Sequence, residues 1–410
     1  MPAPDGSAAG SHSADLDIHD PAFARDPYPH YDQLRQRCPV ARGEKYGGYW
    51  LLTRYGDVRE AARDWRTFTS SVPGVTSIPA AARRTEPQLP LEVDPPLHSR
   101  YRALVNPVFS PLRIERLRPR VEALASRLVD DLLPHLARGE TVDLVSAYAE
   151  PLSIGALAAF TGLPREDGAL WLDWQRRMFD VRHPDDGLRA THEMNAYIVR
   201  LVDQRKRSPH PDDFISLLLQ SEVDGHHLTD KEVHAFCQLQ FGAGFETTAD
   251  AMSITLHYLA QHPQTRAQLA ETPDLHQPAV EEFLRYATPI QIFGRNATRD
   301  LELHGQAVKS GDVVALSYGS ANHDPTVFDA PETCRLDRFA APTAPRHLTF
   351  GAGVHLCLGA PLARLELATT LREFTTRVPP LSLPVDAEVV WKSRGDRRGI
   401  SSLPVRQALG

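Results

Sequence analysis

The stretch FGAGVHLCLG, residues 350–359, places one cysteine at the end of a glycine-punctuated loop. A helical pattern opens directly after it, at residues 360–366. The glycines permit positive φ and let the backbone approach a flat ligand where a Cβ would collide. The free N–H groups and the dipole of a helix N-terminus stabilise a thiolate over a thiol. The stretch therefore predicts that Cys357 binds a metal, although a buried free thiol is the commoner fate of an isolated cysteine.

A long helical pattern at residues 229–261 is the second informative stretch. Thr229 and Glu232 have the spacing of a capping box at its start. The pattern predicts one helix of about 33 residues, roughly 50 Å long. Gly242 and Gly244 stand in its middle, where each glycine costs on the order of 1 kcal/mol against alanine. We attribute them to a planar ligand and a bound diatomic molecule pressed against the helix.

Taken together, these stretches resemble the cytochrome P450 family. The family's haem loop reads F-x-x-G-x-H/R-x-C-x-G, and its long helix carries A-G-x-D/E-T. The loop positions are matched by Phe350, Gly353, His355, Cys357 and Gly359, and the helix positions by Ala243, Gly244, Glu246 and Thr247. The resemblance extends from about residue 26 onward. It implies a mostly α, triangular α+β domain with small β-sheets near one edge, binding haem b.

The resemblance also assigns roles to these residues. Cys357 is implied as the iron ligand, with Phe350 and Gly351 beside it against the haem. Thr247 is implied to hydrogen-bond bound dioxygen by opening its own i−4 backbone bond. Glu246 is implied to relay protons from solvent. Phe245, where many bacterial members have histidine, is interpreted as a packing variation that could narrow the pocket.

Basic residues are expected to hold the haem propionates. His98 and Arg102 are four residues apart and so share one helix face, which suits an anionic group. Such a pair is more often a solvated surface, but it also resembles the family's H-x-x-x-R. Arg295, on a predicted strand at residues 289–295, and His355 complete the implied set.

Glu282 and Arg285 have the spacing of the family's E-x-x-R, a buried structural pair completed by a later arginine. Arg338 is our candidate for that arginine, and Arg335 is the alternative. Buried pairs of this kind specify a fold more than they stabilise it.

Composition limits the remaining possibilities. The 410 residues carry a net charge of −7, which argues against nucleic acid as a partner. The four cysteines are widely separated, as in reduced cytosolic proteins. No signal peptide and no apolar stretch of bilayer length is evident. We therefore expect a cytoplasmic monomer, with residues 1–20 as a flexible tail and 21–410 as a single haem domain.

Residues 100–120 form the most basic segment, with six arginines against the single acid Glu115. These arginines are Arg100, Arg102, Arg113, Arg116, Arg118 and Arg120. One interpretation is a solvated helix face. The other is a docking surface for an acidic electron donor such as a ferredoxin.

The function that the resemblance implies is insertion of one oxygen atom from O2 into a C–H or C=C bond. Because the chain has no flavin or iron–sulfur motif, electrons from NAD(P)H would arrive through a ferredoxin and its reductase. Two alternatives stay open: an H2O2-driven peroxygenase of the same fold, and a non-catalytic recruitment module. The expected substrate is a small hydrophobic molecule. The expected pocket-lining residues are Val75, Ile78, Phe245, Ile290, Ile292 and Phe293, with Arg83 and Arg84 as possible carboxylate contacts.

Overall fold

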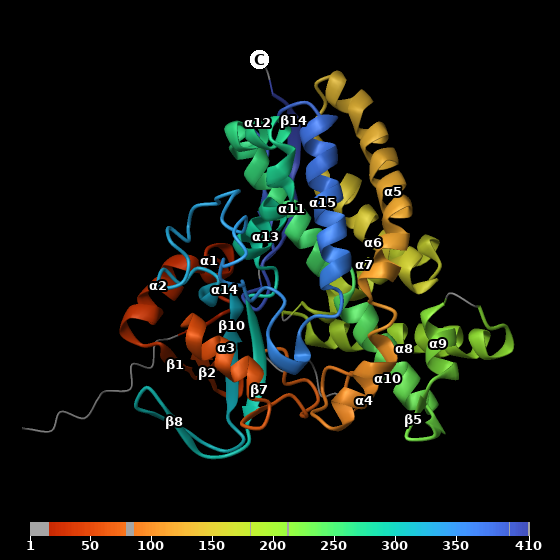
Figure 1. Ribbon diagram of the computed structural model, residues 1–410, viewed down its shortest axis with the longest axis vertical. Coiled ribbons are helices and arrows are strands. Elements are labelled where there is room, and N and C mark those ends of the chain that lie inside the picture. The colour runs from red at the N-terminus through yellow and green to blue at the C-terminus, as the bar shows by residue number, and fades with distance from the viewer. Residues whose placement is uncertain (1–15, 79–85, 181, 211–212, 393, 409–410) are drawn as a thin grey trace, which may run out of the picture.

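The computed structural model describes residues 16–78, 86–180, 182–210, 213–392 and 394–408. The fold is mostly helical with small sheets, as predicted. In outline the molecule is triangular: a sheet-containing corner lies beside a larger body of packed helices (Figure 1). No helix in these described residues combines the length and the apolar character needed to cross a membrane.

The largest sheet has five strands in the order β1-β2-β10-β7-β3. Strand β10 runs parallel to β2 and antiparallel to β7. The strands are β1 (Val40–Gly43), β2 (Tyr49–Leu52), β3 (Phe68–Thr69), β7 (Ile292–Ala297) and β10 (Val313–Ser317). The helices that accompany this corner are α1 (Pro21–Arg25), α2 (Tyr28–Arg37), α3 (Tyr55–Arg63) and α14 (Tyr318–Ala321). Arg295 is buried in β7, together with Ile292, Gly294 and Ala297 of the same strand.

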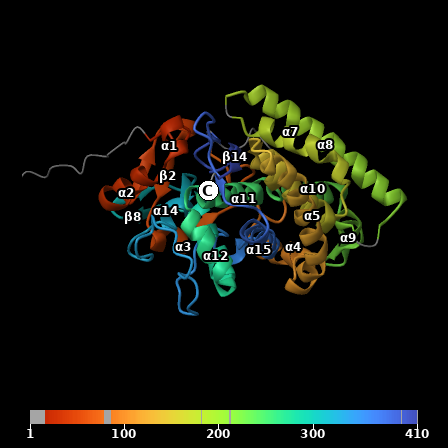
Figure 2. The same cartoon turned by 90° about the horizontal axis from the view of Figure 1, so that it is seen from above.

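The helical body packs its longest elements around one apolar core (Figures 1 and 2). Its helices are α4 (Leu97–Val105), α5 (Pro111–Ala137), α6 (Glu150–Thr161), α7 (Gly168–Met178), α8 (Pro184–Arg207), α9 (Phe214–Gln220), α10 (Asp230–Ala243), α11 (Glu246–Gln261), α12 (Pro263–Glu271), α13 (His276–Ala287) and α15 (Ala360–Thr376). Val121 of α5, Leu152 of α6, Met252 of α11 and Leu367 of α15 are all buried in this core. The apolar residues of α5 recur at helical spacing, so one face of the helix is buried along its length.

The remaining strands are short. They are β4 (Val142–Asp143), β5 (Glu222–Val223), β6 (His226–His227), β8 (Leu301–Leu303), β9 (Gln306–Val308), β11 (Leu381–Ser382), β12 (Val390–Trp391), β13 (Ile400–Ser402) and β14 (Pro404–Gln407). Strands β12 and β13 pair antiparallel. The connection between them reaches the candidate site described below.

The predicted single long helix is interrupted. Its capping box is present, because Thr229 and Glu232 exchange side-chain and backbone hydrogen bonds. The helix then ends at Ala243, and a new one begins at Glu246 after the irregular dihedral angles of Phe245. The break falls between Gly242 and Glu246, where the two glycines lower the intrinsic preference for a helix.

The two glycines of this segment have different environments. A Cβ on Gly244 would lie 2.7 Å from the Gln240 carbonyl oxygen and 2.9 Å from Leu157 Cδ1, so close packing against α6 requires glycine there. A Cβ on Gly242 would meet nothing nearer than 3.7 Å. Both glycines line the cavity, so packing against α6 is a further reason for glycine at position 244, and the predicted contact with a ligand stays a prediction.

The N-terminal prediction is partly corrected. Leu16 and Ile18, which it assigned to the flexible tail, are buried beside the sheet. A Cβ on Gly395 would collide with the Ile18 carbonyl, so the β12–β13 connection packs directly on this segment. Residues 1–15 lie outside the described residues, and the division into a tail and one haem domain stays a prediction.

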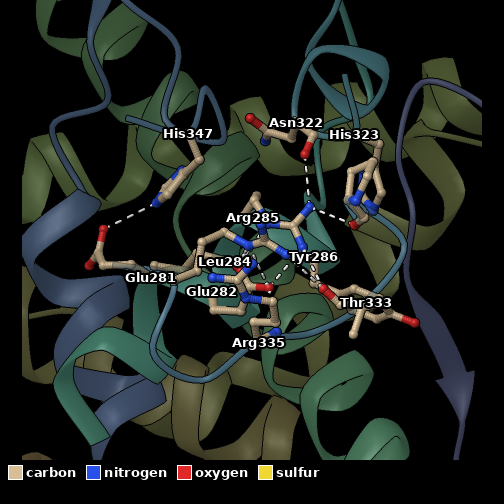
Figure 3. Close-up of polar contacts among 12 residues, drawn as sticks. Glu281, Glu282, Leu284, Arg285, Tyr286, Asn322, His323, Thr333, Arg335 and His347 are labelled. Atoms are coloured by element: carbon tan, nitrogen blue, oxygen red, sulfur yellow. Dashed lines mark hydrogen bonds and ion pairs between the residues drawn. The ribbon is translucent and has the colours of Figure 1, made fainter. Parts of the chain in front are cut away.

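The Glu282–Arg285 pair is fully buried (Figure 3). Arg338 completes it. Arg285 Nε and Nη2 each lie 2.8 Å from a Glu282 oxygen, and Arg338 Nε lies 3.0 and 3.1 Å from the two oxygens. The alternative, Arg335, donates only its backbone N–H to Glu282, and its side chain pairs with Asp329. Arg285 Nη1 also donates to the backbone carbonyl of Asn322. This hydrogen bond connects α13 to the segment that leads to the cysteine loop.

Candidate active site

One cavity of about 520 Å³ brings the predicted site together. It is lined by His98, Arg102, Ala243, Gly244, Thr247, Arg295, Phe350, Gly351, His355, Cys357 and Gly359. The junction of α10 and α11 supplies one part of its wall, and the loop at residues 350–359 supplies another. Glu246 does not line this cavity; it borders a much smaller pocket.

The sulfur of Cys357 is accessible from the cavity. The Cys357 N–H donates to the Phe350 carbonyl at 2.9 Å, which closes the loop. Burial raises the pKa of the Cys357 thiol, while N–H donation from Gly359 and Ala360 and the charge of Arg102 act in the opposite direction. The start of α15 thus acts in the predicted direction, but burial is the larger effect and the pKa of Cys357 stays above its ordinary value.

The loop glycines do not all serve the predicted purpose. Gly351 and Gly353 adopt φ of +71° and +73°, which favours glycine. A Cβ on Gly353 would meet the Ala62 carbonyl and Arg63 Cα, so this glycine permits contact with α3 and not with a ligand. A Cβ on Gly359 would lie 3.8 Å from the Cys357 sulfur, which is ordinary contact.

The basic residues form a cluster with unused donors. Both ring nitrogens of His98 are buried and have no hydrogen-bond partner among the described residues. Burial lowers the pKa of His98 to about 4, with help from His355 and Arg102. Arg295 is buried, and its Nη1 donates to the carbonyl of Gly294 at 2.8 Å. Buried donors that face a cavity without partners call for an anionic ligand, and haem propionates fit them.

Two further residues hold His355 in this cluster. Ser70 Oγ lies 3.0 Å from His355 Nε2, and Asp94 Oδ1 lies 3.9 Å from the same nitrogen. Burial would raise the pKa of Asp94, but hydrogen bonds from His355, Thr69 and the Ser70 N–H outweigh it and lower the pKa. Neither Ser70 nor Asp94 was predicted, because single Ser and Asp residues carry no distinctive spacing.

Thr247 and Glu246 lie at the start of α11. The Thr247 hydroxyl donates to the Ala243 carbonyl four residues earlier, at 3.2 Å. Glu246 is buried and bridged by two cations: Lys392 Nζ lies 2.8 Å from Oε1, and Arg397 Nη1 lies 3.0 Å from Oε2. Burial would raise the pKa of Glu246, but these cations outweigh it and keep the pKa well below the usual range.

Asp250, one turn further along α11, shares the same lysine at 2.7 Å. Burial raises the pKa of Asp250 to about 7, and the charge of Glu246 adds to the effect of burial. A single proton can therefore be held between two carboxylates and Lys392 near neutral pH. The sequence analysis missed this network, although the dense charges of residues 392–398 were a signal.

The predicted pocket-lining residues divide evenly. Ile78, Ile290 and Phe293 line the cavity. Val75 and Ile292 are buried without lining it. Phe245 packs in the helical core, so the prediction that it could narrow the pocket is wrong. Arg83 and Arg84 lie outside the described residues.

Comparison with known proteins agrees with this geometry. A family model for Cytochrome P450 matches residues 170–391. The cytochrome P450 monooxygenase PikC of Streptomyces venezuelae is 34% identical over 99% of this chain and 97% of its own. The polyketide biosynthesis cytochrome P450 PksS of Bacillus subtilis (strain 168) is 32% identical over 94% and 97%. Its solved structure has a TM-score of 0.84 at 31% identity, covering 96% of this chain and 100% of that one.

A structure of a mutant of P450 EryK in complex with erythromycin B is equally similar, with a TM-score of 0.84 at 30% identity over 95% and 98% of the two chains. The chain belongs to the cytochrome P450 family. It is a monooxygenase of the soluble bacterial type, and its cofactor is haem.

Proposed function

We propose that this chain inserts one oxygen atom from O2 into a small hydrophobic organic molecule, by hydroxylation, epoxidation or O-dealkylation. We further propose that electrons come from NAD(P)H through a ferredoxin and its reductase. The observation that carries the proposal is that Cys357 and Thr247 line the same cavity.

We assign the residues that line the cavity to iron ligation and to propionate binding. Cys357 would ligate the haem iron, and His98, Arg102, Arg295 and His355 would hold the propionates. When bound, a thiolate-ligated haem supplies O–O cleavage and oxygen transfer. The protein then has to position the substrate, exclude water and deliver protons.

Proton delivery is assigned to α11. Glu246 directly precedes Thr247 in the chain, but its carboxylate lies outside the cavity, where it is bridged by Lys392 and Arg397. Lys392 contacts Glu246 and Asp250 together and can pass a proton between them. The Thr247 hydroxyl would hold the proton at Oγ1, where it donates to Ala243 until a better acceptor is present.

The substrate proposal rests on the lining. Ile290, Phe293 and Leu239 present apolar surface to the cavity. PksS is named for polyketide biosynthesis, and EryK was solved with erythromycin B, which supports a secondary metabolite of largely apolar character. The four cysteines are free, as in a reducing compartment such as the bacterial cytoplasm.

The first test is the carbon monoxide difference spectrum of the reduced holoprotein. A band near ~450 nm is expected for a thiolate-ligated haem, and Cys357→Ser should abolish it. Cys334→Ser, a buried cysteine away from the cavity, is the matched control and should keep the band. Absence of the band in the wild-type protein would overturn the proposal and favour a non-catalytic module.

The second test separates the two oxidant sources. Turnover of a substrate should require NAD(P)H, ferredoxin and reductase together, and H2O2 alone should support it poorly. Turnover supported equally well by H2O2 alone would show a peroxygenase instead.

A further inference from the structure

A second charged cluster lies on the cavity wall, away from the propionate cluster. Arg394 and Arg397, from the β12–β13 connection, line the cavity together with Phe179, which follows α7. Their guanidinium carbons lie 4.3 and 4.1 Å from the Phe179 ring centroid. One aromatic ring thus holds two cations side by side at the cavity wall.

The positive charge of this cluster is incompletely neutralised. Arg394 pairs through Nη2 with Asp396 at 3.2 Å, and its buried Nε has no hydrogen-bond partner among the described residues. Arg397 pairs with Glu246 at 3.0 Å, yet burial and then repulsion from Arg394 lower the pKa of Arg397. The two arginines therefore destabilise one another, and an anion between them would relieve this repulsion.

The carboxylates on the same wall have cationic partners. Asp180 accepts hydrogen bonds from Arg182 and from the ring of His183, each at 2.9 Å. Asp396 pairs with Arg394 through Oδ2, and its buried Oδ1 has no hydrogen-bond partner among the described residues. Because Lys392 and Arg398 add two further positive charges to this connection, a cationic ligand would meet an excess of positive charge, whereas an anionic ligand would reduce the repulsion between Arg394 and Arg397.

We propose that Arg394, with Arg397 beside it, binds the carboxylate of an otherwise apolar substrate. The substrates of this chain are then hydrophobic carboxylic acids, and the carboxylate stays at the β12–β13 connection while the apolar part extends toward Cys357. This inference rests on the proposed monooxygenase function, because it names the substrate class of the same cavity.

The test uses the full-length holoprotein and matched probes. Dodecanoic acid and adamantane carboxylic acid are each compared with their methyl ester and with a trimethylammonium analogue, which cannot ligate iron. Dissociation constants are measured by the haem spin-state shift and, independently of the haem, by calorimetry. The acids should bind about 10- to 100-fold more tightly than their esters. This ratio corresponds to the free energy that a hydrogen bond to a charged group usually contributes.

Substitutions then locate the effect. Arg394→Gln should reduce the affinity for the acids to that for the esters, and Arg394→Lys should restore part of the preference. Asp396→Asn removes the anionic partner of Arg394 Nη2 and should tighten the binding of the acids. If Arg394 had only a structural role, this variant would not bind the acids more tightly. Arg406→Gln, the control, removes one positive charge from β14 and should leave the affinities for the acids and the esters unchanged. Melting temperature and the carbon monoxide band confirm that each variant is folded.

Two outcomes would overturn the inference: no acid binds better than its ester, or the trimethylammonium analogues bind best. If the carbon monoxide band is present in either case, the proposed function stands and only the substrate class is wrong. If the band is absent, the proposed function fails, and calorimetry still decides whether Arg394 selects acids.

Discussion

At the scale of single residues, the four cysteines show how environment separates a ligand from packing. Burial raises the pKa of Cys237 and of Cys334, and neither residue lines the cavity. Cys357 is opened to the cavity and receives N–H donors from the start of α15. Burial also raises the pKa of Cys357, but it is the one of these three cysteines at which backbone N–H donors oppose that effect, as a metal-ligating thiolate requires.

Thr247→Ala removes the hydroxyl at the helix break. NAD(P)H consumption should continue, but product formed per NAD(P)H should fall by about tenfold or more, with the difference appearing as H2O2. Thr255→Ala is the control, because Thr255 makes the same i−4 bond in α11, away from the cavity. Unchanged product yield in the Thr247 variant would refute its role.

Asp250→Asn tests the shared proton. The folded-state pKa of Asp250 is raised to about 7 from its usual value of 3.8. The stability that Asp250 contributes is therefore present below pH 3.8 and is lost as pH rises toward 7. The variant should gain stability relative to wild type over this window, by up to about 1.4 kcal/mol per pH unit. Urea unfolding of both proteins from pH 5 to pH 8 measures the difference, and parallel curves would contradict it.

At the scale of elements, α4 and α5 carry the arginines whose role the sequence left open. Arg100 pairs with Asp224, and Arg118 pairs with Glu115 and Glu122, so part of the segment is a neutralised surface. Arg116 and Arg120 are exposed on α5. These two residues are the ones available for steering an acidic partner.

Arg116→Glu combined with Arg120→Glu should raise the KM for ferredoxin several-fold at low ionic strength, and the effect should shrink as salt screens it. Steady-state kinetics with a reconstituted donor system measures this change. Arg127→Glu, also exposed on α5 but further along the helix, is the matched control. Equal effects at positions 116, 120 and 127 would indicate general charge repulsion and not a docking surface.

At the scale of the whole molecule, the Glu282 cluster joins segments that are far apart in the chain. Arg338 is 56 residues from Glu282, and the two are buried together with Arg285. Buried charges of this kind cost desolvation, so removing one partner leaves the others uncompensated. The cluster thereby fixes how α13 and the approach to the cysteine loop are placed.

Arg338→Gln should lower the free energy of unfolding by about 3–5 kcal/mol, because it leaves Glu282 short of a buried partner. Arg335→Gln is the control: its half-exposed side chain pairs with the exposed Asp329, and its loss should cost no more than about 1 kcal/mol. Chemical denaturation of the two variants separates them. Similar losses would mean that Arg338 does not complete the cluster.

The local motifs were readable in advance because their residues are close together in the chain. The cysteine loop, the capping box at Thr229 and the Glu282–Arg285 pair each depend on spacings of a few residues. Phe245 was misjudged because helical periodicity cannot show a break, and the break turns this side chain into the helical core.

The sequence by itself determined the family, and it identified the candidate haem-ligating cysteine and a group of cavity-lining residues, since these follow from short-range patterns that constrain local backbone and chemistry. Only the tertiary structure decided which distant charges meet. Glu246 is bridged by Lys392 and Arg397, 146 and 151 residues away, and this contact depends on how the β12–β13 connection packs against α11. Such pairings are set by the burial of whole elements, which no local spacing encodes.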